Sequence, residues 1–433
     1  MTREEQLSHD LIDFIHASPC AFTAVRNIKA ALLKKGFKQL LRSASWDLQK
    51  GGKYFTTKND SSLVAFVVGS GKIEETGFRI ITAHTDSPGL KLKPSPEIVS
   101  DGNYLKLNVE TYGSPILSTW LDRPLSIAGR VTMVSENIME PVVKFINIKR
   151  PLLVIPSLAI HLNREINEQK SYNKQVDMLP VMCLTDTDFK KEDFLKSIIA
   201  KELKVKIEDV LDFDLSLYEY AKGEIAGLNN EFISSSRIDN LSMVHAGIDA
   251  LFDSDKNEAT NIMVCFDNEE VGSMTKQGAQ SVFFSDILKR LVRIFGKSND
   301  SYMRAKVKSF GISADPAHAI HPNFPEKHDP VLRPKINGGP VIKINANQKY
   351  TTDSVSSAVF EMLCKKAGVP FQKYANRSDV AGGSTLGSVL TTHLDIRMVD
   401  VGNAMLAMHS IRELSGVLDH FYMRRVFEEF YKS

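Results

Sequence analysis

The fold class follows from the stretch FRIITAHTDSPG, residues 78–89, in which an apolar run ends at His84 and an acid follows at Asp86. Residues 78–82 are typical of a buried β-strand, and the Pro-Gly pair that ends the stretch is typical of a turn. Ligands of open α/β sheets bind beyond the carboxyl ends of the strands, which is where His84 would stand. The stretch therefore predicts an α/β sheet with a polar site at its edge.

The chain on both sides of this stretch alternates between predicted helices and predicted strands. Residues 4–40 have the apolar spacing of helices, and after about residue 225 a regular succession of strands and helices returns. The predicted elements of that second part are a helix at 241–252, a strand at 261–266, a helix at 285–295, a strand at 306–312, a helix at 354–367 and a C-terminal helix at 421–430.

The middle of the chain has a different pattern. Residues 98–155 hold short β-branched or alternating runs separated by Gly and Pro, which predicts a mostly β module. A helix is predicted farther on, at 189–203. Similar patterns on both sides of a β-rich middle indicate one α/β domain, residues 1–90 and 225–433, with a second domain, residues 91–224, inserted in it.

The composition excludes several classes of protein. The chain has 433 residues, of which 43% are hydrophobic and 24% charged, a balance that excludes a disordered or fibrous protein. The formal net charge is +2 and no run of Lys and Arg stands out, so we expect neither a nucleic-acid partner nor an anionic membrane surface. The N-terminus lacks the pattern of a signal peptide, and no apolar run approaches the roughly 20 residues of a membrane span.

Cysteine usage indicates a reducing compartment. The chain has four widely spaced cysteines without a C-x-x-C pair: Cys20, Cys183, Cys265 and Cys364. This spacing excludes a cysteine zinc ribbon and provides no disulfide framework. We therefore expect a cytoplasmic protein.

Further acids and histidines follow or precede other apolar runs. They are Asp239 before a helix, Glu269 and Glu270 after a strand, Asp315 after the next strand and His409 within an apolar stretch. Each has an ordinary explanation when it is taken singly. An acid before a helix is usually an N-cap, adjacent acids usually form a solvated loop, and a histidine in an apolar stretch is usually a core residue. Only their combination in chain order indicates one site.

Together with His84, this set suits a two-metal hydrolase. Zinc accepts imidazole and carboxylate ligands, and Asp86 is spaced to orient His84 through its second ring nitrogen. A turn hydrogen bond is the alternative role for His84. Two Zn²⁺ ions carry +4, which three carboxylates and a bridging hydroxide balance, so that one Glu remains as a general base. Such ions, about 3.5–4 Å apart, acidify the water between them and polarise a carbonyl.

The chain also carries an ordered series of longer motifs. They are AHTDSPG (83–89), LDRPLSIAGR (121–130), IPSLAIHLNRE (155–165), RIDN (237–240), NEEVGS (268–273), SADPAHAIHPN (313–323), GPVIKINANQKY (339–350) and AMHSIRE (407–413). Across essentially its full length, this series resembles the aspartyl aminopeptidase family of dinuclear zinc aminopeptidases. The resemblance implies an α/β zinc-peptidase-like catalytic domain, with a central mixed β-sheet flanked by helices, and an inserted β-rich dimerisation domain.

Carried over residue by residue, the resemblance implies a role for each candidate. The implied zinc ligands are His84 and Asp315 for one ion, Glu270 and His409 for the other, and Asp239 as the bridge between the two ions. The implied catalytic residues are Glu269 as general base and Asp86 as the group that orients His84. The implied substrate contacts are His161, His318, Lys343 and Tyr350.

The same resemblance implies the reaction and the assembly. A hydroxide activated by two zinc ions, with Co²⁺ or Mn²⁺ as alternative metals, would cleave the N-terminal peptide bond of peptide substrates. The implied preference is for an acidic first residue, Asp or Glu, with Lys343 as its charge partner. The implied assembly is a dimer-based homo-oligomer, a dodecamer, in which His161 reaches a neighbouring active site. A related zinc deacylase or carboxypeptidase and a non-catalytic assembly subunit are the alternatives.

Overall fold

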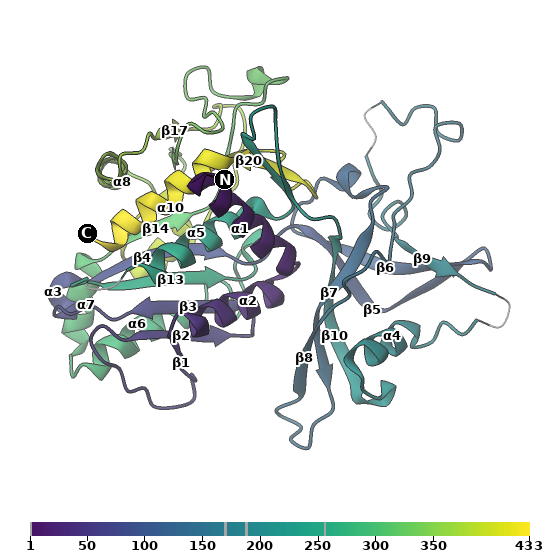
Figure 1. The fold of residues 1–433 in the computed structure, drawn as a ribbon, viewed down its shortest axis with the longest axis horizontal. Helices are drawn as coiled ribbons and strands as arrows, with labels where there is room; N and C mark the ends of the chain where they lie inside the picture. Colours follow the sequence, from purple (N-terminus) through teal and green to yellow (C-terminus); the bar gives the residue numbers. More distant parts are fainter. Residues whose placement is uncertain (1, 169–170, 187–188, 255–256) are drawn as a thin grey trace.

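The computed structural model describes residues 2–168, 171–186, 189–254 and 257–433, which form two lobes (Figure 1). The larger lobe holds both chain ends and a nine-stranded mixed sheet. In spatial order its strands are β1 (Lys38–Gln39), β2 (Lys53–Lys58), β3 (Ser62–Val67), β13 (Thr260–Phe266), β4 (Phe78–His84), β14 (Phe310–Ala314), β18 (Arg397–Gly402), β16 (Val341–Lys343) and β17 (Gln372–Tyr374). The central strands β13, β4, β14 and β18 run parallel to one another.

Helices cover both faces of this sheet, which explains why its central strands are almost continuously apolar. Alternate residues of a strand point to opposite faces, so Ala65 packs in one core while Val64 and Phe66 pack in the other. The first face is covered by α2 (Ala21–Lys34), α5 (Ile238–Phe252), α8 (Ser354–Ala367) and α10 (Val417–Tyr431). The second face is covered by α6 (Phe283–Ile294), α7 (Asn299–Lys308) and α9 (Leu386–Leu394). Helix α1 (Arg3–Ala17) packs against α10 and α2.

The smaller lobe is built on a six-stranded antiparallel sheet. In spatial order its strands are β8 (Val142–Asn147), β7 (Leu125–Met133), β10 (Val210–Glu219), β5 (Gly89–Ser100), β6 (Tyr104–Tyr112) and β9 (Val181–Leu184), and α4 (Phe194–Leu203) packs on it. All six strands lie in the chain between β4 and β13, which are neighbours in the large sheet. The predicted mixed α/β fold with a separate β-rich part is confirmed, and the domain boundaries at residues 90 and 225 stay a prediction.

A third sheet of five strands belongs to the larger lobe and carries part of the polar site. Its strands are β11 (Glu224–Ala226), β12 (Phe232–Ser235), β20 (Glu413–Gly416), β19 (Ala404–Leu406) and β15 (Ala317–His318). Among the described residues, no helix has both the length and the apolar character that crossing a bilayer requires.

The predicted helices at 241–252, 285–295 and 354–367 are confirmed as α5, α6 and α8, whereas the strand at 306–312 is partly wrong. Helix α7 continues to Lys308, and β14 begins only at Phe310. Ser298 caps α7 by accepting the backbone N–H of Ser301 at 3.2 Å, and two lysines in the last turn complement the negative end of the helix dipole. The helical start predicted at residue 189 is also displaced, since α4 begins at Phe194.

Candidate metal centre

The polar site lies where three central strands of the large sheet end side by side. His84 is the last residue of β4 and is paired in register with Phe266, the last residue of β13. Glu269 and Glu270 follow β13 in a 3₁₀ turn, and Asp315 follows β14 directly. The parallel register therefore brings the candidates of distant motifs to the same edge, as the sequence predicts.

Two further candidates reach this edge from other elements. Asp239 stands in extended backbone just inside the start of α5, where Asn240 anchors the chain by donating its side-chain N–H to the carbonyl of Ala314 at 2.9 Å. His409 lies in a turn after β19, with a φ of +68°. Asp239 is 3% exposed, and it does not have the ordinary role of an N-cap because Arg237 occupies the N-cap position of α5.

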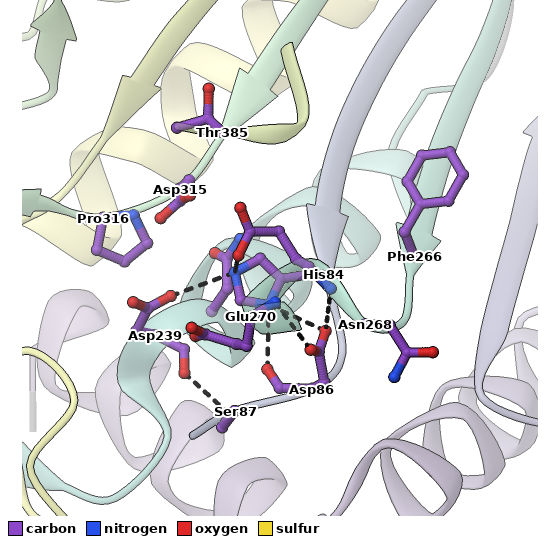
Figure 2. A network of polar contacts seen from close by, with 12 residues as sticks. His84, Asp86, Ser87, Asp239, Phe266, Asn268, Glu270, Asp315, Pro316 and Thr385 are labelled. Atoms are coloured by element: carbon purple, nitrogen blue, oxygen red, sulfur yellow. Dashed lines mark hydrogen bonds and ion pairs between the residues drawn. The ribbon is translucent and has the colours of Figure 1, made fainter. Parts of the chain in front are cut away.

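The two oxygens of Asp239 face two different histidines. Asp239 Oδ1 lies 3.4 Å from His84 Nε2, and Asp239 Oδ2 lies 3.7 Å from His409 Nε2. His409 Nε2 is also 3.5 Å from Glu270 Oε2. Figure 2 shows His84 between Asp239 and Asp86, with Asp315 and Glu270 close by.

This arrangement brings potential ligand atoms close enough together to bind metal ions. Three groups have their potential ligand atoms within 4.8 Å of one another: His84 with Asp239 and Asp315, Asp239 with Glu270 and His409, and His84 with Glu269 and Glu270. The first two groups share Asp239, which is the arrangement that a carboxylate bridging two ions requires. The donor set of imidazole nitrogen and carboxylate oxygen is one that zinc accepts.

The polar atoms of the site fit a cation. Among the described residues, Asp239 Oδ1 and Glu270 Oε1 are buried and accept no hydrogen bond. Burial raises the pKa of Glu269 to about 8 and that of Asp315 to about 6, and burial together with the charge of Asp239 raises the pKa of Glu270 well above its usual range. Bound divalent cations would offset this crowding of negative charge.

Asp86 stands behind His84 and also holds the turn that carries the two glutamates. His84 Nδ1 lies 3.0 Å from the backbone carbonyl oxygen of Asp86 and 3.4 Å from Asp86 Oδ1. The carboxylate also accepts the backbone N–H groups of Glu269 at 3.2 Å and Glu270 at 3.1 Å. Burial alone would raise the pKa of Asp86, but the hydrogen bond and charge of His84 outweigh it and lower that pKa. One carboxylate thus connects the β4 end to the β13 end.

Sequence reasoning missed a second buried carboxylate, Glu413, which does the same for the other half. Glu413 Oε2 accepts the backbone N–H of Asp239 at 3.0 Å, and Oε1 accepts the backbone N–H of His409 at 2.9 Å. The side chain is only 2% exposed. The available signal was its position at the end of the motif AMHSIRE, where it begins strand β20. It could not be interpreted because both partners are backbone groups.

The candidate substrate residues fall into two sets. Lys343, Tyr350 and His318 lie near the cluster: Lys343 Nζ is 3.8 Å from Asp315 Oδ1 and 5.2 Å from the centre of the Tyr350 ring, and His318 packs edge-on against a tyrosine. His161 instead lies in an exposed turn of the smaller lobe. Within the described residues, no hydrogen bond, ion pair or ring contact joins His161 to the cluster.

A pocket of about 270 Å³ lies beside the centre, and its lining includes His318 and Ala407, which is two residues before His409 in the chain. Its other polar lining residues are His321, Lys327, His328, Tyr374, Asn376 and Arg377, without an acidic side chain among the described residues that line it. Burial lowers the pKa of His318 to about 4.

Comparison with known proteins assigns this geometry to a family of enzymes. A sequence profile of the aminopeptidase I zinc metalloproteases (M18) matches residues 14–431. Two curated relatives described as "Probable M18 family aminopeptidase 2" are similar over 100% of this chain and 100% of their own. The protein from Clostridium acetobutylicum is 56% identical and that from Clostridium novyi is 54% identical.

Solved structures agree with the sequence comparison. The structure titled "Cryo-EM structure of the Ape4 and Nbr1 complex" superposes with a TM-score of 0.94 at 36% identity, over 99% of this chain and 86% of that chain. The crystal structure of prApe1 gives 0.93 at 28% identity, over 99% and 94%. The "Structure of S. cerevesiae mApe1 dodecamer" gives 0.87 at 28% identity, over 100% and 97%.

Proposed function

Because this chain belongs to the M18 family of zinc metalloproteases and is an aminopeptidase, we propose that it removes an acidic first residue from peptides at a centre of two zinc ions. The observation that carries the proposal is the position of Asp239, whose two oxygens face one histidine each. The family assignment favours an aminopeptidase over a deacylase, a carboxypeptidase or a non-catalytic subunit.

In this proposal the two clusters that share Asp239 hold one ion each. His84 and Asp315 would hold the first zinc and Glu270 and His409 the second, with Asp239 available to both. When bound, the ions supply an acidified water and a polarised scissile carbonyl. Glu269 accepts a proton from the attacking water and delivers it to the leaving amine. Glu269 suits this role because it belongs to neither cluster that contains Asp239, yet its carboxylate lies within 3.9 Å of His84 Nε2.

The preference for an acidic residue is supported by the donors of the 270 Å³ pocket. His328 Nε2 accepts the backbone N–H of His321 at 3.1 Å, so its ring hydrogen must be on Nδ1. His321 Nδ1 likewise accepts the backbone N–H of Asn323 at 3.2 Å, which leaves Nε2–H as a donor. Arg377 already pairs with Asp379, so Lys327 and the two imidazoles offer donors to a substrate carboxylate.

Lys343 is the second candidate for charge recognition. It is 3% exposed, and it donates to the carbonyl of Pro316 at 3.2 Å beside Asp315. Removing one partner of a desolvated charge pair typically costs about 2–5 kcal/mol. Lys343→Met should therefore lower kcat/KM on Asp and Glu substrates far more than on Leu and Ala substrates.

The assembly is proposed from the relative and from the exposed surface of the smaller lobe. One solved relative is titled a dodecamer. The turn that carries His161 also exposes apolar side chains, with Leu158 52% and Leu162 75% exposed. We propose a dimer-based dodecamer in which this lobe forms the dimer contact and His161 reaches the substrate of a neighbouring subunit.

A substrate panel tests the activity and the preference together. The zinc-loaded protein is assayed on peptides that differ only in the first residue (Asp, Glu, Leu or Ala) and on an N-acylated Asp peptide. We expect fast release of Asp and Glu and no reaction of the blocked peptide. Lys343→Met and Lys327→Met should lose the acidic preference, whereas Lys349→Met, an exposed lysine of the same segment as Lys343, should keep it. Equal rates on all four free peptides would refute the acidic preference.

A further inference from the structure

The smaller lobe contacts the metal centre through the segment Tyr112–Ile116, which begins with the last residue of strand β6. Tyr112 Oη donates to Asp86 Oδ2 at 2.7 Å and accepts the side-chain N–H of Asn268 at 2.7 Å. Asp86 in turn contacts His84 and holds the backbone of both glutamates. The tyrosine hydroxyl therefore fixes the carboxylate behind the first candidate zinc site.

The next residues of the segment contact the second candidate zinc site. His409 Nδ1 lies 3.1 Å from the carbonyl oxygen of Ser114, and the backbone N–H of Ile116 donates to the carbonyl of His409 at 2.9 Å. Because a carbonyl can only accept, the ring hydrogen of His409 must be on Nδ1. The lone pair is then on Nε2, the nitrogen that faces Asp239 and Glu270.

Gly113 shows how closely this segment approaches the ligands. It has a φ of +65°, and a Cβ added there would lie 3.2 Å from Glu270 Cβ and 3.4 Å from the carbonyl oxygen of Glu270. The backbone of the smaller lobe thus packs directly against a candidate ligand. Only glycine combines this conformation with such a close contact.

We propose that Tyr112–Ser114 is a positioning segment of the metal centre, through which the smaller lobe orients His84 by way of Asp86 and sets the ring tautomer of His409. Tyr112 is a positioning residue, since it acts on zinc through Asp86 and His84. The inference rests on the proposed zinc ligands. Loss of such an outer contact typically lowers metal affinity roughly 10- to 100-fold.

Tyr112→Phe tests this inference because it removes one oxygen and keeps the ring, over which Lys91 Nζ lies 3.8 Å from the centroid. Zinc affinity is measured on metal-free protein by competition with a chromogenic chelator, and the visible spectrum is recorded after loading with Co²⁺. We expect zinc affinity to fall roughly 10- to 100-fold at one of two sites, with a shifted Co²⁺ spectrum. The thermal midpoint of the metal-free protein reports whether the fold is retained. Tyr104→Phe, on the same strand but 43% exposed, is the matched control and should bind zinc like the wild type.

A double-variant cycle separates positioning through Asp86 from a general effect on the fold. In the Asp86→Asn background, Tyr112→Phe should cause little further loss of zinc affinity. Two results would overturn the inference, provided that the wild-type protein binds two zinc ions. One is that the losses of zinc affinity in the two single variants add up in the double variant. The other is that Tyr112→Phe alone keeps the zinc affinity and the Co²⁺ spectrum of the wild type. Wild-type protein that binds no zinc would overturn the proposed ligand set, and this inference with it.

Discussion

Replacing Glu269 by Gln separates the proposed base from the proposed ligands more sharply than any other change. The amide has nearly the same shape as the carboxylate but cannot take a proton at neutral pH. The backbone N–H of Glu269 would still donate to Asp86, so the turn that carries Glu270 should keep its position. Glu269 belongs only to the one ligand cluster that lacks Asp239.

The expected effect is a loss of rate without a loss of metal. Removing a general base lowers kcat by roughly 10²–10⁴-fold, which corresponds to about 3–5 kcal/mol of transition-state stabilisation. KM should change little because Glu269 does not line the 270 Å³ pocket that is proposed to bind the acidic side chain. Zinc per subunit, measured by elemental analysis after dialysis, should stay at two.

Glu270→Gln is the matched comparison, one residue along the same turn. Its Oε2 lies 3.5 Å from His409 Nε2 in a cluster that includes Asp239, so the variant should bind less zinc as well as lose activity. The reasoning would be refuted by the reverse pattern, with Glu269→Gln depleted of zinc and Glu270→Gln fully loaded.

Three other predictions follow from contacts outside this turn. His161→Ala and Glu269→Ala subunits, each nearly inactive alone, should recover a sizeable fraction of activity when co-assembled, and verified mixed assemblies without activity would exclude a role of His161 in trans. Glu413→Gln keeps one acceptor for two backbone N–H groups, so it should lower zinc affinity and cost about 1.5–3 kcal/mol of folding stability in a urea titration. His420 is buried and His245 half-buried, and His245 Nδ1 lies 3.0 Å from His420 Nε2. Burial lowers the pKa of both, so below about pH 6.5 the unfolded chain binds more protons than the folded one. The free energy of unfolding should therefore fall by up to about 1.4 kcal/mol per pH unit per histidine as the pH drops from 7 to 5.5, and His420→Gln should flatten that dependence.

The sequence predicts the central strands β4 and β13 of the large sheet because apolar runs and their polar ends are local signals. His84 and Asp315 could be placed at strand ends for this reason, and the register of β4 and β14 brings them together. The exposed Val307 shows the limit of the approach, because a β-branched residue in the last turn of α7 has the same local pattern as a strand.

Contacts between distant parts of the chain could not be predicted in the same way. Tyr112 lies at the end of β6 with no motif around it that indicates a hydrogen bond to Asp86, 26 residues earlier. Glu413 acts only on backbone groups, one of them 174 residues away. Such contacts depend on how distant parts of the chain pack against each other. Neither the hydrophobic periodicity nor the spacing of motifs in the sequence indicates that packing.

The strand order of the smaller lobe has a consequence for how this enzyme could be re-engineered. The chain enters that lobe on β5 and leaves it on β10, and these two strands pair with each other, with Lys91 opposite Ser216. The chain therefore enters and leaves the lobe at one pair of neighbouring strands. The edge strands β8 and β9 should tolerate shortening or exchange without a change in the register of the nine-stranded sheet. A graft that replaces the lobe must nevertheless retain the end of β6. With a foreign lobe that lacks Tyr112, the nine-stranded sheet should still fold, but the metal centre should bind zinc more weakly.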